Sequence, residues 1–164
     1  MIDPPALLSF GGDWESYEDH VYEVFLDTFV RADVRFRGVR VSAQFRPETR
    51  GKGYSFWHVI SEAPHPGNRN EDDRIPHLGH CERIGWIAWA IEQASNGTDG
   101  FCWWENQRGR DTRTVIWAVD CDFVVVLAKR RDYYLLKTAY CELKPHRRRS
   151  FEKERDAFLR DRKG

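Results

Sequence analysis

Three groups of polar residues in this sequence have side chains suited to acid–base or phosphate chemistry. His58 lies in SFWHVISE, and a histidine can act as a general acid or base because its pKa lies near neutral pH. Arg83 lies in HCERIGW, and a guanidinium binds phosphate through two parallel hydrogen bonds. Thr138 and Tyr140 end the segment YYLLKTAY and supply two hydroxyl groups. These four residues are the candidate catalytic set.

Each of these residues also has a structural interpretation. His58 can fill a half-buried position on a strand. Arg83 can pair with Glu82 or with another carboxylate inside the fold. Thr138 and Tyr140 can hydrogen-bond to neighbouring backbone. The residue types alone leave both interpretations open.

A further cluster of metal-ligand residue types comprises His65, His77, His80 and Cys81. Its spacings match known zinc-ligand patterns only loosely, so the sequence favours polar residues of a loop and a helix start. A metal-dependent enzyme that uses this cluster is the third functional interpretation. The cysteines form no CxxC pair, which argues against a zinc ribbon, and their wide spacing argues against a disulfide scaffold.

Composition and missing motifs exclude several classes of protein. The 164 residues are 41% hydrophobic and 14% aromatic, which predicts a single domain, residues 1–164, with a substantial core. No apolar run approaches the ~18 residues of a membrane span, and the first residues do not resemble a secretory signal. We therefore expect a cytoplasmic protein. Walker A, GxSxG, HExxH and dinucleotide motifs are absent, which argues against nucleotide hydrolysis, acyl transfer and metalloprotease chemistry.

The formal net charge is zero, but the charges are segregated along the chain. Residues 1–30 contain acidic side chains and no Lys or Arg, whereas residues 129–149 are strongly basic. A basic edge predicts a polyanion-binding surface, and the alternative is an ordinary solvated surface. The candidate substrate-binding residues are Arg113, Lys129, Lys137, Arg147 and Arg148.

Hydrophobic periodicity predicts the elements that must position these side chains. Residues 1–12 form an arm, and residues 13–30 form an amphipathic helix. Apolar and polar residues alternate in residues 34–45 and 54–61, which predicts two strands, with His58 on the second. An exposed loop is predicted for residues 63–76. A second, nearly all-apolar helix spans residues 77–95, and such a helix lies between layers.

The second half of the chain predicts a series of antiparallel strands. They cover residues 101–106, 113–120, 123–130 and 132–143, and the turn Arg130–Asp132 is too short for a crossover. Strict alternation in the last strand places Tyr134, Leu136, Thr138 and Tyr140 on one face. A short helix, residues 149–164, ends the chain. The predicted fold class is α+β, with an N-terminal helix and a central helix packed on a four- to six-stranded antiparallel sheet.

The segments GKGYSFWHVISE, HCERIGWIAWAIE and RTVIWAVDCDFVVVLAKRRDYYLLKTAY, together with the acidic first helix, carry a family resemblance. They resemble phage- and prophage-borne proteins of the barnase–EndoU–colicin–RelE nuclease superfamily. The resemblance implies helices followed by a four-stranded antiparallel sheet whose concave face holds the active site. The residues whose positions correspond to those of the superfamily's active-site residues are His58, Arg83, Arg113, Lys129, Thr138 and Tyr140.

The same resemblance implies a function. The protein would be a metal-independent endoribonuclease without a cofactor, which cleaves RNA by attack of the 2′-hydroxyl. It would act as a toxin or phage-conflict effector. RNA is then the substrate, and a cognate antitoxin or immunity protein is the expected partner. The alternative is a non-catalytic RNA- or protein-binding module on the same fold. The sequence does not distinguish tRNA, mRNA and rRNA targets.

Overall fold

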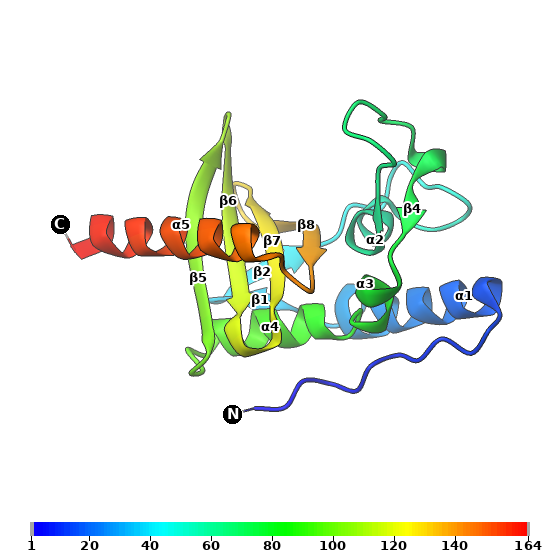
Figure 1. The fold of residues 1–164 in the computed structure, drawn as a ribbon, viewed down its shortest axis with the longest axis horizontal. Coiled ribbons are helices and arrows are strands. Elements are labelled where there is room, and N and C mark those ends of the chain that lie inside the picture. The colour runs from blue at the N-terminus through cyan, green and yellow to red at the C-terminus, as the bar shows by residue number, and fades with distance from the viewer. Residues whose placement is uncertain (1, 164) are drawn as a thin grey trace.

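The computed structural model describes residues 2–163, which form one sheet of six strands, a two-stranded ribbon and helices on both faces of the larger sheet (Figure 1). The helices are α1 (Trp14–Phe25), continued by a π-helical turn at Leu26–Val30, then α2 (Tyr54–Ile60), α3 (Leu78–Glu82), α4 (Trp86–Ser95) and α5 (Pro145–Lys163). The strands are β1 (Arg35–Phe36), β2 (Val39–Ser42), β3 (Ser61–Glu62), β4 (Ile75–Pro76), β5 (Phe101–Arg108), β6 (Asp111–Ala118), β7 (Phe123–Lys129) and β8 (Tyr134–Tyr140). The predicted α+β class is confirmed.

The large sheet has the order β1-β2-β8-β7-β6-β5. Strands β5 to β8 form an antiparallel meander, as the short connections predicted. The β7–β8 hairpin is closed by a hydrogen bond from the Arg130 nitrogen to the Tyr133 oxygen, 2.8 Å long. One pairing departs from the antiparallel prediction, because β2 joins β8 in parallel at Val41–Tyr134.

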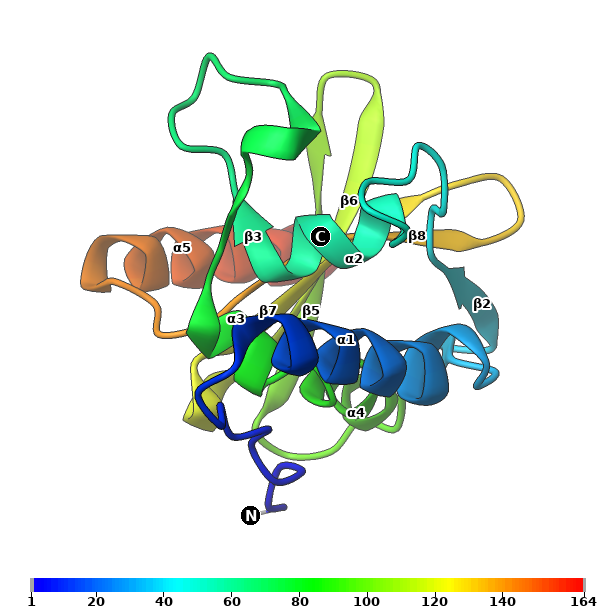
Figure 2. The same ribbon diagram turned by 90° about the vertical axis from the view of Figure 1, so that its right-hand side faces the viewer.

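Each face of the sheet has its own hydrophobic core. Helix α4 covers one face, and α1 lies beyond the β8 edge and packs on α2 and α3, so that Phe25, Ile91 and Leu127 share one core (Figure 1). Helix α5 crosses the other face, where Phe151 packs on Trp104 and Trp117 (Figures 1 and 2). Because strand residues alternate between faces, each residue of β5 to β7 can be assigned to the α4 side or the α5 side.

The strand predicted at residues 54–61 is wrong, because this segment is helix α2. Its aromatic and β-branched residues are typical of a strand. Because Phe56, Trp57 and Val59 are all buried, the helix has no polar face, and the sequence shows no helical hydrophobic period. Helix α2 lies along the outer edge of β8 beyond the short β2 pairing, where Ser55 Oγ donates to the Leu136 carbonyl. It protects an edge that would otherwise expose backbone donors and acceptors.

The helix predicted at residues 77–95 is divided in two. Helix α3 ends at Glu82 and α4 begins at Trp86. Arg83 has left the helical conformation, with φ −103° and ψ 18°, and Gly85 follows two residues later. Glycine is a poor helix former, which explains a break at this point inside an apolar run.

The chain termini pack against this framework. Helix α5 begins at Pro145 rather than at residue 149, and proline suits a first helical position. Phe151 anchors it, whereas Leu159 is exposed. The N-terminal arm is held by a hydrogen bond from Trp86 Nε1 to the Pro5 carbonyl. No helix within residues 2–163 combines the length and the apolar character needed to cross a membrane.

Candidate functional site

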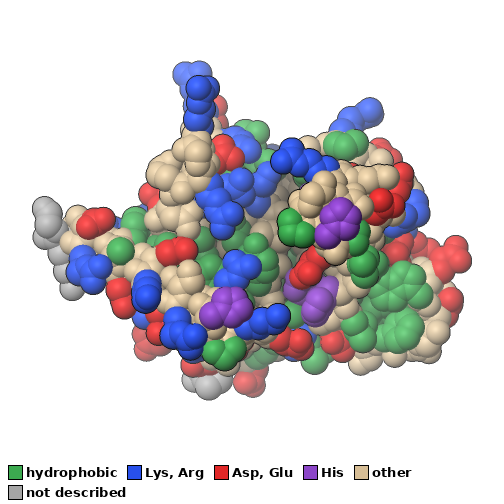
Figure 3. All heavy atoms as spheres, turned by 45° about the horizontal axis from the view of Figure 1, so that its top comes forward, with side chains coloured by type: hydrophobic (Ala, Val, Ile, Leu, Met, Phe, Trp, Pro, Cys, Tyr) green, Lys and Arg blue, Asp and Glu red, His purple; other side chains and the backbone are tan. Residues whose placement is uncertain are grey.

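A small cavity opens on the α5 side of the sheet, and we call it the cleft. Its volume is about 140 Å³, and its polar lining consists of Asn106, Arg108, Arg113, Thr138, Tyr140, Arg147, Ser150 and Glu154. Space-filling representation shows Lys and Arg side chains gathered in a hollow between the β5–β6 hairpin and the part of the molecule that carries α2 (Figure 3). The structure therefore brings together four of the predicted site residues: Arg113, Thr138, Tyr140 and Arg147.

A β-bulge in β8 determines which residues face the cleft. Val126 pairs with Thr138, but the next residue of β7 pairs with Leu136, so Lys137 is the extra residue. Leu136 is buried in the core on the α4 side, whereas Thr138 lines the cleft. The predicted strict alternation from Tyr134 to Tyr140 is therefore wrong, although Thr138 and Tyr140 do share a face.

Positive charge dominates the cleft. Arg108, Arg113 and Arg147 line it, and Lys137 lies near Arg113 without lining it. Burial lowers the pKa of Lys137, and the neighbouring charges of Arg113 and Arg130 lower it further. Asp111 pairs with both arginines, at 3.3 Å from Arg113 and 3.6 Å from Arg130. The remaining carboxylate, Glu154, is occupied by hydrogen bonds from neighbouring side chains. The cations therefore outnumber the carboxylates that could neutralise them, which favours an anionic ligand.

Several donors in the cleft have no protein partner among residues 2–163, and two of them matter for the chemistry. Arg113 Nε is buried and makes no hydrogen bond. The Tyr140 hydroxyl also lacks one, and its ring lies under the Arg147 guanidinium, 4.9 Å from the ring centroid. A buried donor without a partner costs about 1–3 kcal/mol, so a bound anion would recover this free energy.

Thr138 does not offer its proton to the cleft. Its hydroxyl donates a 3.0 Å hydrogen bond to the carbonyl of His58, at the end of α2. The structural interpretation of Thr138 is therefore the one observed. The bond joins β8 to α2 and fixes the position of His58 beside the cleft.

His58 lies on α2 rather than on a strand face, and its side chain does not line the cleft, although its carbonyl accepts the hydrogen bond from Thr138, which does. Its Nε2 atom is 2.8 Å from Glu71 Oε1, and its ring stacks on Tyr54. Burial lowers the pKa of His58, Arg74 lowers it further, and the Glu71 carboxylate opposes both. The imidazole is therefore neutral at pH 7 and is in the form that a general base needs.

Arg83 lies away from the cleft. It donates to the Gly79 carbonyl at 3.0 Å and lies 3.8 Å from Glu142 and 4.0 Å from Glu82. Its guanidinium also stacks over Trp86. The predicted convergence of Arg83 with Thr138 and Tyr140 is wrong, and the alternative of an internal pair with carboxylates is the observed arrangement.

Two other predicted cations also lie outside the cleft. Lys129 pairs with Glu105 at 3.4 Å, and strand alternation puts both on the α4 side. Arg148 pairs with Asp122 at the β6–β7 connection and stacks on Trp117. The basic segment at residues 129–149 is thus divided between different surfaces, which the linear sequence could not show.

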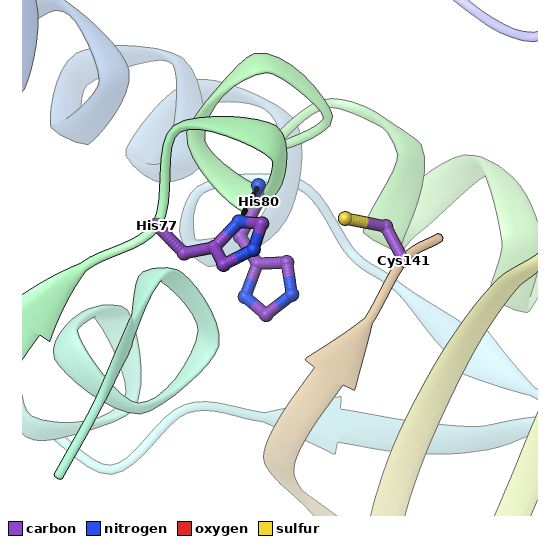
Figure 4. A group of neighbouring side chains, drawn as sticks. All are labelled: His77, His80 and Cys141. Atoms are coloured by element: carbon purple, nitrogen blue, oxygen red, sulfur yellow. Dashed lines mark hydrogen bonds between the residues drawn. The ribbon is translucent and has the colours of Figure 1, made fainter. Parts of the chain in front are cut away.

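A second cavity, which we call the histidine pocket, adjoins the cleft through Tyr140 and Arg147. Its volume is about 480 Å³. His77, His80 and Cys141 meet in its wall (Figure 4), with one potential ligand atom from each residue within 4.8 Å of the others. Burial and the neighbouring His77 lower the pKa of His80 to about 4, and burial raises the pKa of the Cys141 thiol to about 11 against the opposing charge of Arg83.

The residues that the sequence missed share one property, which is that they reach the site from distant segments. Glu71 comes from the loop at residues 63–76, and Arg108 and Asn106 come from β5. Cys141 replaces Cys81 in the histidine cluster, because Cys81 is fully buried in the core. No local pattern in the sequence pointed to Glu71 or Cys141, because each reaches its partners from a distant segment.

Comparison with known proteins gives no match to a family model, to a curated protein or to a solved structure.

Proposed function

We propose that this protein binds RNA in the cleft and cleaves it as an endoribonuclease that needs no metal ion at the scissile phosphate. The observation that carries the proposal is that Arg108, Arg113 and Arg147 line one small cavity together with Tyr140, while the Lys137 ammonium lies near Arg113. Cationic side chains that surround a free hydroxyl donor suit a phosphodiester, whose negative charge increases in the transition state.

The proposed mechanism assigns one step to each group. His58, neutral and paired with Glu71, removes the proton of the 2′-hydroxyl, whose oxygen attacks the adjacent phosphorus. The new P–O2′ bond forms as the P–O5′ bond breaks, which gives a 2′,3′-cyclic phosphate. Tyr140 gives its proton to the departing 5′-oxygen, and solvent then carries the proton held by His58 back to Tyr140. Arg113, Lys137 and Arg147 stabilise the phosphorane charge.

The alternative remains a binding module on the same fold. One observation favours it: the Thr138 hydroxyl, a candidate donor to the phosphate, is already committed to the His58 carbonyl. Such a protein would bind RNA through the same cations without cutting it. In either case, a protein inhibitor of the cleft would present acidic side chains to it.

The test is incubation of the full chain with total RNA, with and without EDTA. Cutting that resists EDTA and ends in 2′,3′-cyclic phosphate is the expected result. Binding without cutting would establish the alternative function, and cutting abolished by EDTA would assign the chemistry to a metal. No binding of RNA at low salt would overturn both interpretations of the cleft. Lys129→Gln is the matched control for variants of cleft cations, because Lys129 lies on the opposite face.

A further inference from the structure

The wall of the histidine pocket contains soft and borderline metal ligands from two distant parts of the chain. His77 precedes α3, His80 lies within α3, and Cys141 follows the last residue of β8. Their potential ligand atoms all lie within 4.8 Å of one another (Figure 4). The fold therefore brings together three residues that no local motif in the sequence connects.

The strongest sign of a missing ligand is His80. Its side chain is buried, with only 8% of the residue exposed, and its Nδ1 atom has no hydrogen-bond partner within the described chain. His77 is also weakly engaged, because its Nδ1 atom accepts a single long hydrogen bond, 3.4 Å from the His80 backbone nitrogen. Buried polar atoms in native proteins are nearly always paired, so an unpaired ring nitrogen beside a thiol and a second imidazole calls for a ligand.

We propose that His77, His80 and Cys141 bind a divalent transition metal ion, zinc in the first instance, which joins α3 to the end of β8. Imidazole and thiolate are the ligands that zinc prefers, whereas magnesium and calcium prefer oxygen. Zinc–nitrogen bonds of about 2.0–2.1 Å and zinc–sulfur bonds of about 2.3 Å place tetrahedral ligand atoms ~3.5 Å apart. The three atoms must therefore approach by about 1 Å, which side-chain rotation can supply.

The surroundings of the cluster suit this ion. The fourth coordination position faces the pocket, whose wall also includes Glu62 and His146. A metal at His77 would replace its long hydrogen bond to the His80 nitrogen. Binding transfers the Cys141 thiol proton to solvent, because only a thiolate ligates zinc.

This proposal is independent of the proposed function. It depends on neutral nitrogen and sulfur ligands in the histidine pocket, whereas the RNA proposal depends on cations in the cleft. It also differs from the metal cluster considered from sequence, because Cys81 is fully buried within the core and Cys141 takes its place. Its readouts are metal binding and thermal stability, not RNA cleavage.

The experiment uses the full chain, freed of metal by chelation and then titrated with zinc against a coloured indicator. One equivalent should bind and raise the melting temperature. Cobalt should bind in the same place and give the near-ultraviolet charge-transfer band of a thiolate–cobalt bond. Cys141→Ser should abolish that band and weaken zinc binding by at least about 100-fold, since it removes a direct ligand.

Controls keep the test decisive. Cys121→Ser and His65→Gln remove a cysteine and a histidine outside the cluster, so both should bind zinc like the parent chain. His77→Ala is the second cluster variant, in case Cys141→Ser fails to fold, and its fold is checked by circular dichroism. The proposal is overturned if cobalt shows no thiolate band, if zinc binds less than one equivalent, or if folded cluster variants bind zinc as tightly as the controls do.

Discussion

The cleft and the histidine pocket share Tyr140 and Arg147, but they contain different kinds of side chain. The cleft is lined by three guanidinium groups and by one carboxylate, Glu154, which neighbouring side chains already occupy, so it attracts an anion. In the pocket wall, Glu62 and Glu142 are balanced by Lys144 and Arg147, and the imidazole and thiol groups supply ligands for a metal cation. Two ligands of opposite charge can therefore be held on either side of one shared wall.

The end of β8 accounts for this difference. Lys137 is the extra residue of a bulge that places Thr138 and Tyr140 on the α5 side. Cys141 follows immediately and joins the core on the α4 side, next to α3. One strand therefore supplies a proton donor to the cleft and a sulfur ligand to the pocket. Tyr140 and Cys141 are neighbours in the chain but serve separate sites. A substitution in the cleft should therefore leave the histidine pocket intact, and the reverse should also hold.

The largest effect that would separate the two cavities is expected from Tyr140→Phe. Loss of the hydroxyl donor that we assign to the leaving oxygen should lower the rate of RNA cleavage by about 10²–10⁴-fold. RNA affinity and zinc affinity should stay near the parent values, because the aromatic ring under Arg147 is kept. The measurement is single-turnover cleavage beside filter binding, with Tyr133→Phe in the exposed turn as the matched control. Equal rates in the two variants would remove Tyr140 from the chemistry.

His58 tests whether a proton acceptor serves the cleft from its edge. His58→Ala should slow cleavage by about 10²-fold. In the parent chain, burial and Arg74 lower the pKa of His58 below 6.5, so the base is neutral at pH 7 and becomes protonated only in more acidic solution. The cleavage rate should therefore fall about tenfold per pH unit below that pKa, and this acid limb should vanish in His58→Ala. His65→Ala, in the neighbouring loop, is the control, and an acid limb that persists without His58 would assign the base to another group.

The cations of the cleft should affect binding more than fold. Arg113→Gln and Lys137→Gln should each weaken RNA binding about tenfold and reduce the slope of log affinity against log salt by about one. Lys129→Gln should change neither, because its side chain pairs with Glu105 on the other face. A slope that changes equally in all three variants would mean that RNA covers the whole surface and not the cleft.

The sequence predicted those features of the fold that a local pattern determines. It did not predict those that depend on contacts between distant segments. The β7–β8 hairpin was predictable because the turn at Arg130 is too short for a crossover. Helix α2 was misread as a strand because burial on nearly every side, as at Phe56, removed its helical period. The bulge at Lys137 and the contact of Cys141 with His77 arise from pairings between distant segments, and no local signal carries them.

The same distinction explains the predicted site residues. Thr138 and Tyr140 were found because a strand that changes from apolar to hydroxyl side chains leaves a core, and that reasoning needs only one segment. Arg83 was misassigned because a guanidinium can bind a phosphate or an internal carboxylate equally well. Glu142, one of its carboxylate partners, lies far along the chain, so the sequence did not reveal the pair. Residue type indicated which chemistry was available, whereas topology decided where it could be used.

The smallest expected effect distinguishes the role of Thr138 from that of Tyr140. Thr138→Val keeps the shape of the side chain but removes its hydrogen bond to the His58 carbonyl, so the free energy of unfolding should fall by about 1 kcal/mol. Thr114 offers a matched control, because its hydroxyl is fully buried without a partner within residues 2–163. Thr114→Val removes an unpaired polar group, and it should therefore be neutral or stabilising in urea denaturation. If Thr138→Val instead left stability unchanged and reduced cleavage as strongly as Tyr140→Phe does, its hydroxyl would have to turn into the cleft during the reaction, and Thr138 would act on the phosphate after all.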